Sequence, residues 1–394
     1  MRINGFRFAA VEAAIKKPGR LDLALIESTL PAAAAAVFTT NKVKAAPVLL
    51  CMDRVARNPV RAIVINSGNA NACTGEQGLD DARETAQKVA QCLDINEDEV
   101  LVASTGVIGV PLPMERLRGA LAPLVLGLDS GAELEDVARA IMTTDTFPKI
   151  EVRQGVADGK TYSVAGVAKG AGMIMPNMAT MLAFIVTDAA VQPEWLQQVF
   201  SVASDVSFNS ITVDGDTSTN DTAIILANGA AGNEPLDAHS EGSTEFVRLL
   251  NEVLLSLAHQ IVRDGEGATK FVTVTVTGAV SDEQARKAAM AVANSCLVKT
   301  AFYGQDANWG RILAAVGYSG IMVDQDRVDL SFNDVLMAKN GLFAGGDAEA
   351  RGSKVLRLKE FTVTVDLKLG MGCATVYTSD LSHDYVSINA DYRT

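Results

Sequence analysis

Thr180 stands between a glycine-rich loop and an apolar run, within the segment KGAGMIMPNMATMLAFIVTD at residues 169–188. A threonine hydroxyl is almost never ionised at neutral pH, so it becomes a nucleophile only beside a base. One such base is the residue's own α-amine, which titrates near about pH 8 but exists only if the chain is cut before the threonine. The pattern therefore allows a self-cleaving precursor that breaks the bond between Ala179 and Thr180. Composition alone favours a plainer interpretation, a glycine turn followed by a buried strand.

Motifs elsewhere in the chain decide between these interpretations. The segment at residues 169–188 resembles the central motif of the ornithine acetyltransferase family, also called the bifunctional glutamate N-acetyltransferase or ArgJ family. In that family the motif K-G-[SA]-G-M-x-x-P-x-[ML]-A-T-M-L carries the autocleavage site and the nucleophile. Further segments resemble the family in the same order over nearly the whole chain, at residues 38–41, 66–72, 104–109, 264–270, 299–301, 306–311 and 388–394. The sequence is therefore identified as a member of this family.

The resemblance implies that Thr180 is used twice. Its hydroxyl first attacks the Ala179 carbonyl in an N-to-O acyl shift, and hydrolysis of the ester leaves an α chain of residues 1–179 and a β chain of residues 180–394. In catalysis Thr180 then accepts acetyl from N2-acetyl-L-ornithine and passes it to L-glutamate. The covalent intermediate divides one difficult amide transfer into two easier steps.

Thr105 and Gly106 match the oxyanion-hole pair of the family. Acyl transfer passes through a tetrahedral oxyanion, and each fixed donor to it is worth about 3–4 kcal/mol. Taken without the resemblance, Ser104-Thr105-Gly106 would be an ordinary turn.

The resemblance also implies a set of substrate contacts. Lys169 suits the α-carboxylate of an amino acid, and its order before Gly170 does not fit a phosphate-binding loop. Glu266 suits the side-chain ammonium of ornithine, although in sequence alone it is an acid at a solvated turn. The full implied set is Thr143, Lys169, Thr180, Glu266, Asn389 and Thr394, with Thr146 as the alternative to Thr143. Because Asn389 and Thr394 lie in a tail that would normally fray, the tail must fold back against the site.

No metal site and no cofactor are expected. The three histidines are isolated, without the spacing of metal ligands. The acidic residues at 214–221 look like a calcium loop, but Ile225 stands where an EF-hand has glutamate, so we interpret this stretch as a structural turn beside the active site. Whether acetyl-CoA is a second acetyl donor is left open by the sequence.

Composition limits the partners. The formal net charge is -13, which argues against nucleic acid, because binding to phosphates needs a cationic face. No apolar run is long enough to span a bilayer, and five scattered cysteines without a signal peptide predict free thiols and a cytoplasmic location. The expected partners are therefore small amino-acid substrates and the chain's own α and β fragments, which the resemblance places in a heterotetramer.

Helices and strands alternate along the chain, which predicts the α/β (α+β) class. Strands are expected at residues 61–66, 99–104, 181–187, 211–213, 222–227 and 270–277, helices at 79–93, 133–142, 192–206, 243–263 and 281–295, and mostly strands from 327 on. We expect an N-terminal domain at residues 1–188 with the cleavage site, a middle α/β region at 189–280 and a C-terminal α/β domain at 281–394. The resemblance implies an αββα-type layered, self-cleaving N-terminal-nucleophile-like fold with a smaller C-terminal α/β domain.

Two alternatives to the acetyltransferase stay open. One is a self-cleaving N-terminal-nucleophile aminopeptidase or amidohydrolase, in which water in place of glutamate would resolve the acyl-enzyme. The other is a binding protein that keeps the fold without catalysis. The matches at Lys169, Glu266 and Asn389 favour the transferase.

Overall fold

The chain forms two compact units, seen in a computed structural model that describes residues 3–57, 59–175 and 181–391. The first unit comprises Met1–Asn209 and Asp216–Ile261, and the second comprises Ser210–Gly215 and Val262–Thr394. Both units combine helices with a sheet, which confirms the α/β class. The division into three domains that we expect from the sequence stays a prediction.

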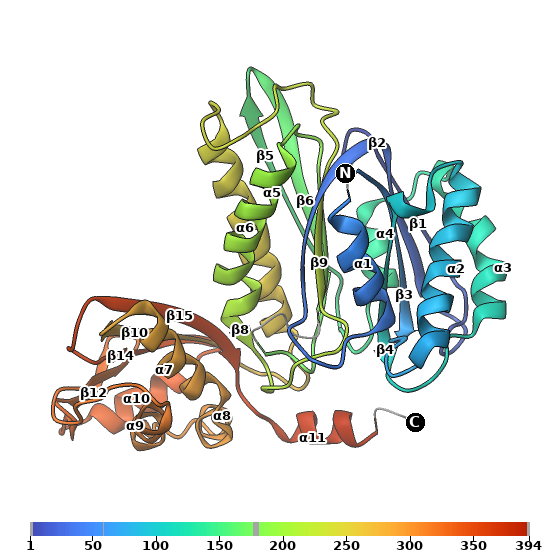
Figure 1. Ribbon diagram of the computed structural model, residues 1–394. Coiled ribbons are helices and arrows are strands. Elements are labelled where there is room, and N and C mark those ends of the chain that lie inside the picture. The colour runs from blue at the N-terminus through green and yellow to red at the C-terminus, as the bar shows by residue number, and fades with distance from the viewer. Residues whose placement is uncertain (1–2, 58, 176–180, 392–394) are drawn as a thin grey trace. The chain divides into compact units, whose positions relative to one another are not determined.

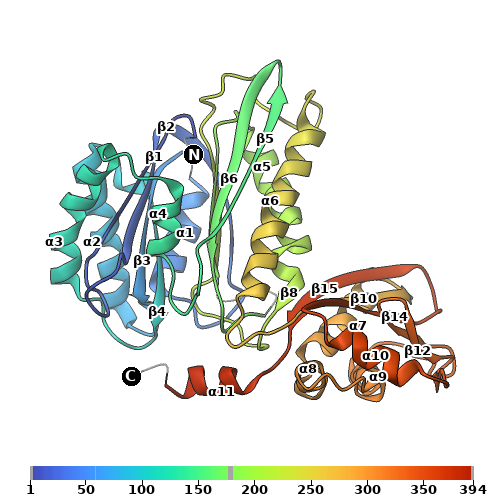
Figure 2. The same cartoon turned by 180° about the vertical axis from the view of Figure 1, so that it is seen from behind.

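The first unit is built on a sheet whose described strands run in the order β4-β3-β2-β9-β7-β6-β5, with β1 paired to β2. The long strand β2 changes register near residues 28–31, so that its first half pairs with β3 and its second half with β9. Figures 1 and 2 show β2 arching over the unit, which divides the sheet into two halves. The strands are β1 (Phe6–Val11), β2 (Leu23–Phe38), β3 (Val60–Asn69), β4 (Val100–Val107), β5 (Lys149–Ala157), β6 (Lys160–Lys169), β7 (Leu182–Thr187) and β9 (Thr222–Ala227).

Helices cover the outer faces of the two halves (Figures 1 and 2). α5 and α6 lie beside the half that holds β5, β6 and β9, while α2 and α3 lie beside the half that holds β1, β3 and β4. This layering is the αββα arrangement that the resemblance implies. The helices are α1 (Ala46–Val55), α2 (Gly75–Leu93), α3 (Met114–Leu126), α4 (Leu134–Ala140), α5 (Pro193–Val206) and α6 (Ser243–Arg263).

The core of the first unit explains why β7 and β9 read as continuous apolar runs. Every residue of both strands is buried, because each strand has a neighbour on either side and is covered on both faces. Side chains from both halves, such as Leu25 and Phe184, belong to one hydrophobic cluster. α5 begins at Pro193. Proline is favoured in the first turn of a helix, because the N–H group that it lacks would have no partner within the helix there.

The second unit has its own sheet, in the order β13-β12-β11-β14-β10-β15-β8 over the residues described. Strand β10 alternates buried and half-buried residues, as its alternating sequence predicts. The strands of the second unit are β8 (Ile211–Thr212), β10 (Phe271–Ala279), β11 (Asp329–Phe332), β12 (Val335–Lys339), β13 (Leu342–Phe343), β14 (Glu360–Asp366) and β15 (Gly372–Ser379). Its helices are α7 (Asp282–Asn294), α8 (Cys296–Tyr303), α9 (Trp309–Tyr318), α10 (Ala348–Leu356) and α11 (His383–Ala390), the last two within the region expected to be mostly strands. Across residues 3–57, 59–175 and 181–391, no helix combines the length and apolar character needed to cross a membrane.

Candidate active site

Several strand ends of the first unit meet at one edge, and the side chains expected to do chemistry come from them. β3 and β4 are parallel, so both reach this edge with their C-terminal ends, where Thr105 and Gly106 lie. Lys169 is the last residue of β6 and pairs with Leu182, the first residue of β7. Leu182 pairs in turn with Thr222, the first residue of β9. Residues far apart in the sequence are therefore neighbours here.

Lys169 contacts the proposed oxyanion residue directly. Its Nζ donates to Thr105 Oγ1 at 3.4 Å, and both residues are only 3% exposed. An ammonium group only donates hydrogen bonds, so Thr105 Oγ1 is the acceptor in this pair. The Thr105 hydroxyl can therefore still donate its own hydrogen to another group.

Asp145 is the acidic centre of this group. Its carboxylate accepts from Lys149 Nζ at 2.7 Å and from the backbone N–H groups of Gly170 at 2.7 Å and Thr143 at 2.9 Å. Lys169 Nζ lies 4.0 Å from the same carboxylate. Thr143, the predicted substrate contact, is thus brought into the group through its backbone.

The lysines decide the charge of Asp145. Burial by itself raises the pKa of this carboxyl, but the charges of Lys169 and Lys149 and the hydrogen bonds from Lys149 and Gly170 outweigh burial and lower the pKa to about 2. Opposite charges at short range favour the ionised form in this way. Asp145 is therefore an anion at neutral pH.

Gly106 allows two backbones to approach closely. Its φ is +135°, and a Cβ added to it would lie 2.3 Å from the Gly68 carbonyl carbon and 2.5 Å from Asn69 N. Any side chain would collide with the neighbouring strand, so only glycine fits here. The proposed oxyanion pair consequently sits on a strand end whose geometry tolerates little change.

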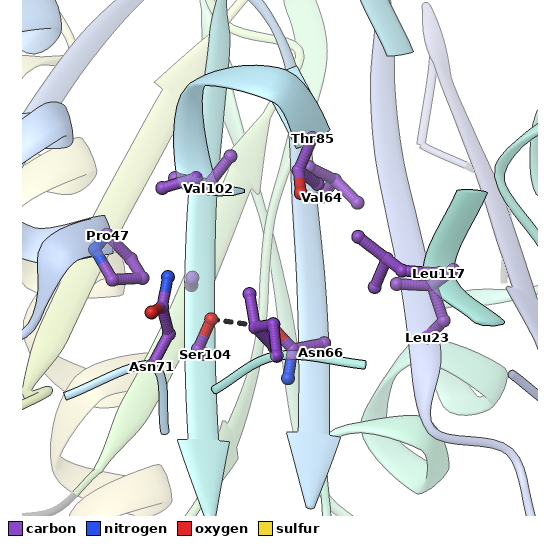
Figure 3. A pocket seen from close by; sticks show the side chains of 12 residues that line it. Leu23, Pro47, Val64, Asn66, Asn71, Thr85, Val102, Ser104 and Leu117 are labelled. Atoms are coloured by element: carbon purple, nitrogen blue, oxygen red, sulfur yellow. Dashed lines mark hydrogen bonds between the residues drawn. The ribbon is translucent and has the colours of Figure 1, made fainter. Parts of the chain in front are cut away.

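A small cavity, about 10 Å³ in volume, lies on the opposite face of β4 (Figure 3). Ser104 and Asn66 point toward one another there, and Ser104 Oγ donates to Asn66 Oδ1 at 2.6 Å. Because successive side chains of a strand point to opposite faces, Ser104 faces this cavity while Thr105 faces Lys169. The residues lining the cavity therefore pack against the face of β4 opposite to the Thr105 side chain.

Ala179, Thr180 and Thr394 lie outside the described residues. Met181, which follows Thr180, is described and is held on both sides. Its N–H donates to Asp221 Oδ1 at 3.1 Å, and its carbonyl accepts from Thr222 N at 3.2 Å.

The remaining predicted substrate contacts belong to the second unit, where two of them meet. Glu266 Oε2 accepts from Asn389 Nδ2 at 2.8 Å. Asn389 lies on α11, so the chain end is helical up to Ala390 and contacts the loop that carries Glu266. A hydrogen bond holds this loop, because Asp380 Oδ1 accepts from the backbone N–H of Thr269 at 2.8 Å.

Asp145, Lys149, Asn220 and Asp221 were not predicted as site residues. A signal for Asp145 existed, since it lies between Thr143 and Thr146 in a segment already singled out. Its importance depends on lysines that only the fold brings together. Asn220 and Asp221 were placed in a structural turn, and their contacts with two strand ends could not be read from the sequence.

Comparisons with known proteins show the family of the chain. The sequence model of the ArgJ family matches residues 7–394. A protein of Geobacter sulfurreducens named arginine biosynthesis bifunctional protein ArgJ is 72% identical over 394 residues, covering 100% of both chains. A protein of the same name from Syntrophotalea carbinolica is 54% identical over 394 residues, again covering 100% of both. The crystal structure of an arginine biosynthesis bifunctional protein argJ from Bacillus halodurans is 42% identical with a TM-score of 0.51, covering 52% of this chain and 97% of that one.

Proposed function

Because this chain belongs to the ArgJ family, we propose that it cuts itself between Ala179 and Thr180 and then transfers acetyl from N2-acetyl-L-ornithine to L-glutamate through acetyl-Thr180. Family membership confirms the enzyme class expected from the sequence, an acetyltransferase of arginine biosynthesis. The observation that carries the finer proposal is the buried group of Thr105, Lys169 and Asp145 at the strand ends next to Met181.

The roles follow from the chemistry of acyl transfer. The Thr180 hydroxyl attacks the acetyl carbonyl while the α-amine of Thr180 takes its proton. The Thr105 hydroxyl and the Gly106 N–H donate to the oxyanion, each worth about 3–4 kcal/mol. Ornithine leaves with the proton, and the amino group of glutamate attacks the acetyl-threonine ester to give N-acetylglutamate and free Thr180.

Lys169 is proposed to bind the α-carboxylate of the amino acid, with Thr143 beside it. Asp145 lies 4.0 Å from Lys169 Nζ and holds this ammonium group in place by its negative charge. Glu266 and Asn389 are proposed to bind the side-chain ammonium of ornithine, since the 2.8 Å bond between them orients an acid that is 9% exposed. Thr394 completes the proposed set of substrate contacts.

The proposal includes the predicted assembly and setting. The α chain of residues 1–179 and the β chain of residues 180–394 would stay together as a heterotetramer with two copies of each, in the cytoplasm. Acetyl-CoA would be a co-substrate only if the enzyme also acetylates glutamate directly, which an assay with acetyl-CoA as the sole donor decides.

The central test is to trap the intermediate. Purified protein is incubated with N-acetylornithine without glutamate, quenched in acid and weighed by mass spectrometry. We expect one acetyl group on Thr180 of the 180–394 fragment, discharged on addition of glutamate. Thr180→Ala should stay uncut and unacetylated, whereas Thr161→Ala, an exposed threonine on β6, should behave as wild type. Discharge to water at the same rate with or without glutamate would favour the hydrolase instead.

A further inference from the structure

The segment at residues 218–221, just before β9, ties together several parts of the first unit. All four of its residues are buried, and Asp221 is 0% exposed. Thr39 N donates to Asp221 O at 3.0 Å and Ala45 N donates to Thr219 O at 2.9 Å. The segment is therefore fixed by its backbone, which leaves its side chains in defined positions.

Asn220 uses this position to hold the ends of β3 and β4. Its Nδ2 donates to Ser104 O at 2.8 Å and to Ala70 O at 2.6 Å, and its Oδ1 accepts from Thr219 Oγ1 at 2.6 Å. Two carbonyl acceptors at one end and a hydroxyl at the other make the orientation of the amide unambiguous.

The bond to Ser104 O acts on the next residue as well. The carbonyl of Ser104 and the N–H of Thr105 belong to one planar peptide unit. A hydrogen bond that fixes the carbonyl therefore fixes the rotation of the whole unit, including the backbone from which the Thr105 side chain departs. Thr105 is the residue whose hydroxyl is proposed to meet the oxyanion.

Asp221 makes the equivalent contact on the nucleophile's side. Its Oδ1 accepts from Met181 N at 3.1 Å, and Met181 follows Thr180 directly in the sequence. Its Oδ2 is buried and meets no donor in good hydrogen-bond geometry among the described residues, although the nearby hydroxyls of Thr39 and Ser218 also lower its pKa. Burial, the largest influence, raises the pKa of Asp221 well above its usual range, although the Met181 N–H and the charge of Lys169 favour ionisation. An uncharged carboxyl suffices for the observed bond, because Oδ1 acts only as an acceptor.

We infer that Asn220 and Asp221 are positioning residues for acyl transfer, Asn220 by orienting the Ser104–Thr105 peptide and Asp221 by orienting the Met181 amide. The inference rests on the proposed function, because it assigns these two residues to the nucleophile and oxyanion donor named there. Two adjacent residues thereby hold the backbone at Thr105 and the backbone N–H of Met181, the residue that follows the proposed nucleophile. Such spacing matters for rate, since a displacement of about 1 Å costs about 100-fold.

The chain offers a matched control for each residue. Asn233 is also buried and also donates from Nδ2 to two backbone carbonyls, those of Ala190 at 3.1 Å and Glu234 at 2.7 Å. Asp188, at the other end of β7, is 2% exposed and accepts from Ser163 N at 2.6 Å. Substitution of either control removes backbone hydrogen bonds of the same kind, and for Asp188 also the bond from Asn4 Nδ2 at 2.9 Å, without touching the strand ends of the site.

The experiment measures four quantities in each purified variant: the melting temperature, the rate of self-cleavage, the rate of Thr180 acetylation by N-acetylornithine in a single turnover, and the steady-state KM for N-acetylornithine. Asn220→Ala and Asp221→Ala should slow acetylation about 100-fold with KM changed less than about threefold. Asn233→Ala and Asp188→Ala should lower the melting temperature to a similar extent and leave acetylation within about threefold of wild type. Asp221→Asn should restore most of the rate lost in Asp221→Ala, since the amide keeps a neutral oxygen acceptor.

The outcomes separate this inference from the proposed function. If wild-type protein forms no acetyl-Thr180, the proposed function is wrong, and the inference, which depends on it, is wrong as well. If wild type is acetylated and Asn220→Ala and Asp221→Ala react at nearly its rate, the inference alone is overturned. Equal loss of rate in the control variants would also overturn it, by showing a general effect of stability. Should Asn220→Ala not fold, Asp221→Asn against Asp221→Ala still decides: equal defects in both would refute a neutral positioning acceptor.

Discussion

Asp145 and Asp221 are two buried carboxyl groups of the first unit that both experience the charge of Lys169, yet their pKa values move in opposite directions. Asp145 has two lysines and two backbone N–H groups around it. Asp221 has one backbone N–H on Oδ1, and the hydroxyls of Thr39 and Ser218 and the charge of Lys169 lower its pKa by less than burial raises it. Two buried carboxyls thus differ: Asp145 is an anion, and Asp221 keeps its proton more readily than an ordinary carboxyl does. The balance between burial and the charges and donors around a carboxyl decides which role it can take.

The largest expected difference between the two carboxyls is in stability at neutral pH. Asp145→Asn leaves Lys149 and Lys169 buried beside a neutral amide, and removal of one partner from a buried ion pair costs about 3–5 kcal/mol. Asp221→Asn keeps the acceptor for Met181 N and should cost less than about 1.5 kcal/mol. Chemical unfolding of both variants in the uncut Thr180→Ala background measures this. Similar losses in the two variants would mean that the two carboxyls carry the same charge.

A smaller effect is expected in how the contribution of each carboxyl to stability changes with pH, and the change has opposite signs for Asp145 and Asp221. The pKa of Asp145 is lower in the folded chain, about 2, so its contribution to stability is present above the ordinary carboxyl pKa and is lost as the pH falls toward that value. The pKa of Asp221 is higher in the folded chain, so its contribution is present below the ordinary pKa and is lost as the pH rises through the raised value.

The two asparagine variants report these signs through melting temperatures measured across a pH series. The deficit of Asp145→Asn relative to wild type should shrink toward acid, while that of Asp221→Asn should shrink as the pH rises. Parallel curves for both variants would contradict pKa shifts of opposite direction at the two carboxyls.

The smallest expected effect is the coupling between the two residues. Because the charge of Lys169 lowers the pKa of both carboxyls, the double variant Asp145→Asn/Asp221→Asn should depart from additivity by about 0.5–1 kcal/mol. Pairing Asp221→Asn with Asp188→Asn, at the far end of β7, provides the additive reference. Strict additivity in both pairs would mean that Lys169 acts on only one of the carboxyls.

The sequence predicted the elements that obey a local rule and missed those that depend on partners. The limits of α6 and β9 match the expected residues 243–263 and 222–227, because an amphipathic helix ended by glycine and a buried apolar run each have a clear pattern. The hairpin of β5 and β6 was not anticipated, although Asp158-Gly159 joins the two strands with both φ angles positive. An Asp-Gly pair is among the strongest local signals for such a turn.

The candidate site divides in the same way. Thr105, Gly106 and Lys169 could be named because their motifs are distinctive and lie beside glycines. Asp145 is harder to name, because Lys169, one of the two lysines that lower its pKa, becomes its neighbour only in the fold. The roles of all these residues stay predictions until the intermediate is trapped.

The strand order of the first unit makes folding before the cut different from refolding after it. The bond between Ala179 and Thr180 lies between β6 and β7, and the order β2-β9-β7-β6 places two strands from beyond the cut between two strands from before it. Once severed as proposed, the fragments remain interdigitated and can separate only by breaking the sheet on both sides. Folding before the cut is a unimolecular event, whereas refolding after it requires two chains to find each other and depends on concentration. A mature molecule that unfolds has therefore lost the connection that first assembled it.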